Sequence, residues 1–180
     1  LSRRQRQMCI RDSYSSMLLG ALGKTLLLTL LSLLFAMIIG MIFALMNVGR
    51  NRVLNCIGTI YVDAVRGVPL IVLAYFIYFG VPYCLNNMMG FNFTLTALQA
   101  GTVCLALNCG AYMAEIIRAG ILSVDPGQME AARSLGLPYS RAMIRVVLPQ
   151  AIRTMIPSII NQFIITLKDT SILSLSLIHI

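Results

Sequence analysis

Residues 123–149 read SVDPGQMEAARSLGLPYSRAMIRVVLP, a polar and charged segment between two long apolar ones. Asp125 is placed to cap a helix, because its carboxylate can accept a hydrogen bond from a free N–H of the first turn. Pro126 suits the first helical position, and Gln128 completes a pattern like a capping box. Gly136 offers the left-handed conformation that ends a helix. The segment therefore predicts a short, well-capped helix that begins at Pro126 and ends before Gly136.

A second short helical piece is expected in the same segment. Pro138 prevents the first helix from resuming. Arg141 and Arg145 are four residues apart and so share one face of the second piece. We expect Leu148 and Pro149 to close this unit and to open the next apolar run.

The first helix has the composition of a docking element. Ala131 and Ala132 are small, so another backbone could approach them closely, and Glu130, Arg133 and Arg141 would add charge specificity to the contact. Spacing alone leaves a second interpretation open, in which this is a solvated loop helix without a partner.

The order of these residues resembles the EAA signature of ABC-importer permeases. Glu130-Ala131-Ala132 is followed after three residues by Gly136, and after nine more by Val146-x-Leu148-Pro149, where the family usually has Ile at the position of Val146. The resemblance runs from about residue 14 to residue 174 and points to the polar-amino-acid branch of the family. Three further blocks carry it: YVDAVRGVPLIVLAYFIYFGVP, GAYMAEIIRAGILSV and PQAIRTMIPSIINQFIITLKDTSILS.

The resemblance implies an all-α permease core of the type I importer class, in a bacterial cytoplasmic (inner) membrane. Two permease copies, identical or paralogous, would form the pathway, and an extracytoplasmic binding protein would deliver a polar amino acid such as histidine, glutamine, arginine, lysine or glutamate. Cytoplasmic ATP-binding subunits would hold ATP-Mg and receive the EAA helix. The residues implied in this coupling are Gln128, Glu130, Ala131, Ala132, Gly136, Arg141, Leu148 and Pro149.

Composition supports a polytopic membrane protein. Hydrophobic residues make up 58% of the chain and form continuous runs. The net charge of +8 lies mostly in loops, which argues against a nucleic-acid partner. The chain has no GxxxxGK[ST] loop, HExxH motif or nucleophile elbow, its five cysteines lack metal-ligand spacing, and its one histidine, His179, has no partner. We therefore expect no enzyme, no bound cofactor and no metal site.

Four membrane spans are expected, of the five in the family core. The external loop between the second and third contains no lysine or arginine, whereas Arg50 and Arg52 follow the first span, so the N-terminus is predicted outside and the coupling helix in the cytoplasm. The expected spans cover residues 26–46, 53–85, 97–122 and 151–167.

Both ends of the chain differ from the sequence between them. Residues 1–13 hold four arginines and one aspartate, a net +3, and residues 175–180 read LSLIHI. A signal-peptide n-region is rejected for the first, because no small-residue cleavage site follows the apolar run. We interpret both ends as non-native, and residues 14–174 as a transmembrane domain truncated at its C-terminus.

Charged and bend-forming residues near the cytoplasmic ends of the spans are candidates for gating. Asp63 and Arg66 are three residues apart and could pair on one helix face, as could Glu115 and Arg118. An interfacial salt bridge is the alternative for the first pair. We expect Gly67 and Pro69 to bend the second span.

A polar cluster marks the outer half of the last span. Lys168, Asp169, Thr170 and Ser171 begin 18 residues after Gln150, roughly 27 Å along a helix. With Asn161 they offer the charges and hydroxyls that a zwitterionic substrate needs, so they are predicted to line the substrate path. A loop at the membrane surface is the alternative. A permease for another small solute and a structural membrane protein remain alternative functions for the whole chain.

Overall fold

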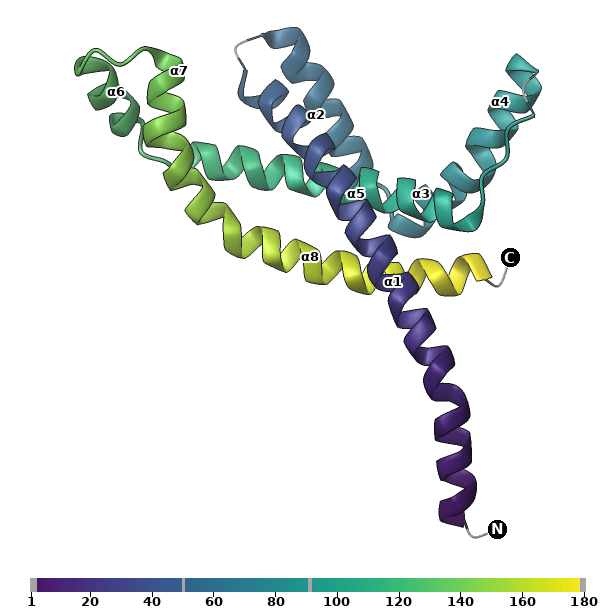
Figure 1. The fold of residues 1–180 in the computed structure, drawn as a ribbon. Helices are drawn as coiled ribbons and strands as arrows, with labels where there is room; N and C mark the ends of the chain where they lie inside the picture. Colours follow the sequence, from purple (N-terminus) through teal and green to yellow (C-terminus); the bar gives the residue numbers. More distant parts are fainter. Residues whose placement is uncertain (1–2, 50, 91, 179–180) are drawn as a thin grey trace.

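The computed structural model describes residues 3–49, 51–90 and 92–178, and every regular element in them is helical. Figure 1 shows an open arrangement in which α1 crosses α5 and α8, while its first part extends away from the other helices. Arg50 and His179, named in the analysis above, lie outside the described residues. The elements are α1 (Arg3–Val48), α2 (Arg52–Gly67), α3 (Leu70–Tyr75), η1 (Phe76–Gly80), α4 (Val81–Met89), α5 (Ala97–Leu122), α6 (Pro126–Ser134), α7 (Tyr139–Ala142), η2 (Met143–Val147) and α8 (Leu148–Ile178).

The four predicted membrane spans are confirmed as four long apolar helical stretches within the described residues. The third has the predicted limits. The first helix begins far before residue 26, the second stretch begins at Leu70 and not at residue 53, and the last begins at Tyr139 and not at residue 151. These stretches are Leu19–Val48, Leu70–Met88, Ala97–Leu122 and Tyr139–Leu173.

Helix α5 forms the centre of the bundle, since α1, α2, α3 and α8 all contact it. Many of its buried residues are small, among them Ala106, Gly110 and Ala114, and small residues let membrane helices approach closely. At Gly110 a β-carbon would lie 2.9 Å from the Ile39 side chain of α1. Thr96 caps the helix, in a capping box with Gln99 that our sequence analysis missed.

Hydroxyl groups add polar bonds between the helices. The Tyr61 hydroxyl donates to the Leu107 carbonyl at 2.8 Å, joining α2 to α5. The Thr29 and Thr170 hydroxyls lie 3.0 Å apart and join α1 to α8. Such bonds stabilise contacts between membrane helices, where lipid cannot satisfy polar groups.

The predicted bend at Gly67 and Pro69 is a complete break. Val68 is extended (φ −99°, ψ 132°), as expected for a residue before proline, and α3 starts only at Leu70. The break leaves Val68 and Pro69 outside any helix, between the end of α2 at Gly67 and the start of α3 (Figure 1).

Helix α8 begins at Leu148, where the next apolar run was expected to open, but no loop separates it from the preceding piece, because α7, η2 and α8 run on as one continuous helical path. Both π-helical segments precede a proline: η1 comes before Val81-Pro82 and η2 before Leu148-Pro149. In η2 the Leu148 N–H donates to the Met143 carbonyl, five residues back. A wider turn reduces the clash of a proline ring with the preceding turn, so the helix continues.

Candidate substrate cavity and coupling helix

Helix α6, predicted to be the coupling helix, has the predicted ends. The Asp125 carboxylate accepts a hydrogen bond from the Gly127 N–H at 2.7 Å, and Pro126 is the first helical residue. The Leu137 N–H donates to the Ala132 carbonyl and the Gly136 N–H to the Arg133 carbonyl, the two bonds of a Schellman motif. These bonds close the C-terminal end of the helix.

Gln128 does not form the reciprocal bond of a capping box with Asp125. Its side-chain oxygen instead accepts a hydrogen bond from the Gln150 amide at 3.4 Å, which joins α6 to the start of α8. Helix α6 packs against η2, which continues into α8. This packing brings Gln128 close to Gln150.

The two alanines of the signature face different ways. Ala132 is buried, whereas Ala131, Glu130 and Gly136 are exposed. Ala132 therefore serves the packing of α6 within this chain, and Glu130 and Ala131 lie on the surface open to a partner. The remaining predicted coupling residues differ in solvent exposure: Arg141 and Pro149 are exposed, and Leu148 is half-buried.

A cavity of about 490 Å³ lies where the end of α2, the break after it, α5 and α8 meet. It contains one carboxylate, from Asp169, and one guanidinium, from Arg66. The buried amides of Asn108 and Gln162 add further hydrogen-bonding groups. Its other lining residues are Gly67, Val68, Pro69, Leu70, Tyr112 and Ile165.

Of the five residues predicted for the substrate path, Asp169 lines this cavity. Asn161 and Lys168 are exposed on α8 and are not among its lining residues. Thr170 is buried against Thr29 of α1, and its hydroxyl donates to the Thr166 carbonyl of α8 at 2.8 Å. Ser171 donates to the Lys168 carbonyl. The cluster is thus divided among different faces of α8.

Our sequence analysis did not assign Tyr112 and Gln162 to the cavity. A signal for them existed: Gln162 and Asp169 are seven residues apart, and Asn108 and Tyr112 are four apart, which are spacings of residues on one helix face. Nothing in the sequence showed that these two faces would meet.

Among the described residues, the one ion pair joins Arg118 to Glu115, with two bonds of 3.0 and 2.5 Å. The predicted pairing of Asp63 with Arg66 is not formed. The Arg66 guanidinium lies instead over the Tyr112 ring, 5.1 Å from its centroid. Because α5 packs beside α2, its aromatic ring provides Arg66 with a cation–π partner that the sequence could not indicate.

The arrangement described so far, with four apolar helical stretches and a cavity of charged and amide groups, is that of a polytopic membrane protein with a polar interior site. A family model described as "binding-protein-dependent transport system inner membrane component" matches residues 36–177. The chain belongs to this family, and the prediction of a type I ABC-importer permease is confirmed. As a member it is a transport subunit and not an enzyme, and in this family separate subunits bind ATP.

Two curated relatives come from Bacillus subtilis (strain 168). The L-cystine transport system permease protein TcyB is 40% identical over 165 residues, which cover 92% of this chain and 68% of the relative. The probable glutamine ABC transporter permease protein GlnM is 42% identical over 158 residues, covering 88% of this chain and 70% of the relative.

Solved structures share the fold. A crystal structure described as an amino acid ABC transporter with histidines matches with a TM-score of 0.82 and 39% identity, over 93% of this chain and 75% of that one. An inward-facing structure of the MetNI methionine ABC transporter matches with a TM-score of 0.67 and 24% identity, over 91% of this chain and 74% of that one. The second match shows the common fold alone.

Proposed function

We propose that this chain is the permease of an ABC importer for polar amino acids, and that the cavity of about 490 Å³ is its substrate site. The observation that carries the proposal is the presence of Asp169 and Arg66 in one cavity, because an α-amino acid has one ammonium and one carboxylate to pair with them. The names of TcyB, GlnM and the amino acid transporter structure support the same substrate class.

In this proposal each charge has a defined role. Asp169 accepts hydrogen bonds from the substrate ammonium, and the Arg66 guanidinium donates two parallel bonds to its carboxylate. Asn108 and Gln162 then face the substrate side chain. Lys168, predicted from the sequence to line the substrate path, is less suited to bind the substrate carboxylate, since it is exposed and is not among the residues that line the cavity.

The partners follow from the family. We propose that a second permease copy completes the pathway, that cytoplasmic ATP-binding subunits receive α6 through its exposed Glu130 and Ala131, and that an extracytoplasmic binding protein delivers the substrate. The protein would lie in a bacterial cytoplasmic membrane with the loop before α5 outside. A permease for another small solute is the second candidate, and the paired charges of the cavity favour the amino acid.

The test is ATP-driven uptake by the complete importer, reconstituted with its ATPase subunits and binding protein. A panel of L-glutamine, L-cystine, L-arginine and L-histidine identifies the substrate. Asp169→Asn should weaken its apparent affinity about ten-fold or more, because a lost charge-assisted bond costs roughly 1.5–3 kcal/mol. Lys168→Gln is the matched control, since it neutralises the neighbouring charge outside the cavity lining. Equal uptake kinetics for the two variants would remove Asp169 from the substrate site.

A further inference from the structure

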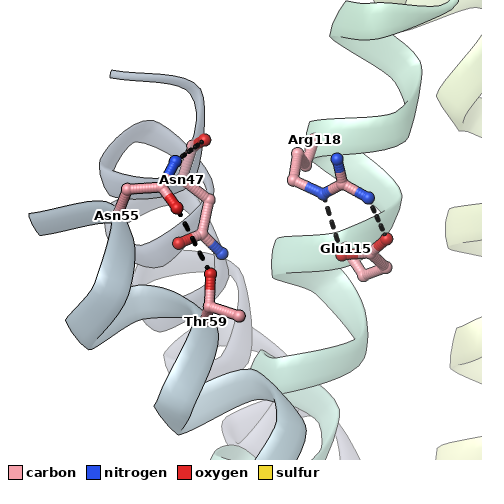
Figure 2. Close-up of polar contacts among 5 residues, drawn as sticks. All are labelled: Asn47, Asn55, Thr59, Glu115 and Arg118. Atoms are coloured by element: carbon pink, nitrogen blue, oxygen red, sulfur yellow. Dashed lines mark hydrogen bonds and ion pairs between the residues drawn. The ribbon is translucent and has the colours of Figure 1, made fainter. Parts of the chain in front are cut away.

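A second cavity, of about 320 Å³, lies toward the end of α5 that leads into the coupling region. Figure 2 shows amide and hydroxyl groups of α1 and α2 on one side of it and the Glu115–Arg118 ion pair of α5 on the other. The lining residues are Asn47, Asn55, Thr59, Val62, Asp63, Arg66, Glu115 and Arg118. This lower cavity has the polar groups of a binding site, and the proposed substrate site does not include it.

The two cavities are adjacent and share one residue. Arg66 lines both of them. On α5 the nearest lining residues are Tyr112 of the upper cavity and Glu115 of the lower one, three positions or roughly 4.5 Å apart along the helix. Arg66 lies in the last turn of α2, and its guanidinium lies over the Tyr112 ring of α5.

Each cavity also has its own carboxylate to complement the shared guanidinium. Asp169 lies in the upper cavity and Asp63 in the lower one. Glu115 and Arg118 neutralise each other, whereas Asp63 forms no ion pair with any described residue. Asp63 and Arg66 are three residues apart on α2, a spacing at which their side chains are neighbours. The lower cavity therefore offers a ligand one negative and one positive group on the same helix face.

We infer that the lower cavity is an exit site for the transported amino acid on its way to the cytoplasm. The inference rests on the proposed function, since it takes the same zwitterion from the upper cavity. The substrate carboxylate stays on Arg66, and the ammonium passes from Asp169 to Asp63. Asn55 and Thr59, which line the same cavity from α2 (Figure 2), then contact the side chain of the amino acid. Asp63 thus acts in release, after the first binding step.

The test separates binding from turnover in the complete importer. The probe is L-glutamine, or L-cystine, L-arginine or L-histidine where the uptake panel selects one of these. Asp63→Asn should leave equilibrium binding to the ATP-free importer within about two-fold of the parent, while ATP-driven uptake falls about ten-fold or more because the exit step has lost its ammonium partner. Asp63→Glu should restore uptake, since it restores the charge.

A second measurement reports on the lower cavity directly. In a background without native cysteines, Thr59→Cys is labelled by a thiol reagent from the cytoplasmic side of inside-out vesicles. The amino acid should slow this labelling, and adding Asp63→Asn should abolish the protection. D-mannitol, which has no charges, is the control solute and should give no protection.

The possible failures are distinguishable. The exit site is overturned if Asp63→Asn shows normal uptake, or if the amino acid does not protect Thr59→Cys from labelling. The upper site is still supported in that case if Asp169→Asn weakens binding. The exit site is also overturned if Asp63→Asn weakens equilibrium binding as strongly as Asp169→Asn does, because Asp63 would then hold the substrate together with Asp169. Normal binding in Asp169→Asn contradicts the proposed upper site, whatever Asp63 shows.

Discussion

Gly136 adopts a backbone conformation that most residues resist. Its φ is +82°, and it is the position where the chain leaves α6. A valine there should strain the turn by roughly 1–2 kcal/mol, because its β-carbon approaches the following carbonyl. Since α6 is the proposed contact with the ATPase subunits, we expect Gly136→Val to lower uptake several-fold relative to ATP hydrolysis, measured in the same reconstituted preparation.

A conservative change at the same position separates conformation from side-chain size. No atom lies within 4 Å of a β-carbon at Gly136, so space is not the constraint. Gly136→Asn should keep nearly normal coupling, since asparagine tolerates the left-handed region. Full coupling in Gly136→Val would show that this turn is not needed for transport.

At the scale of elements, the contact between α1 and α5 depends on close approach at Gly40. A β-carbon at this position would lie 2.6 Å from the Met113 β-carbon and 3.1 Å from the Ala114 backbone nitrogen. Backbone atoms cannot move aside cheaply, so Gly40→Ala should cost about 1–3 kcal/mol from overpacking. The thermal unfolding midpoint in detergent should fall by several degrees.

The matched control lies on the same helix. A β-carbon at Gly23 would meet nothing within 4 Å, so Gly23→Ala should leave the midpoint unchanged or raise it through better helix propensity. If the two alanine variants unfold at the same temperature, then α1 and α5 can separate slightly without loss, and the close packing is not a source of stability.

At the scale of the whole molecule, charge predicts which side of the membrane each loop faces. Asn92 lies in the loop before α5 and Ser134 at the end of α6, and both are exposed. In a background without the five native cysteines, Asn92→Cys should react with an impermeant thiol reagent added to intact cells. Ser134→Cys should react only in inside-out vesicles, because arginines follow the positive-inside rule. The opposite labelling pattern would invert the topology.

Features that depend on a few neighbouring residues were determined by the sequence itself. Asp125 and Pro126 at the start of α6, Gly136 at its end and the limits of α5 were all predicted, because capping bonds and apolar runs are local. The EAA pattern likewise identified the family from its spacing. Local patterns did not show how the helix passes Pro149: a π-helical turn joins the predicted second helical piece to α8 without a break.

Only the tertiary structure decided which polar residues act together. Asp169 and Arg66 share one cavity because the end of α2, α5 and α8 all line it, and Thr170, the next residue after Asp169, is turned instead toward α1. Arg66 lies over Tyr112 rather than against Asp63, although the helical spacing permits that pair. The physical reason is that the direction of a side chain is local, whereas its partner depends on which helix packs beside it.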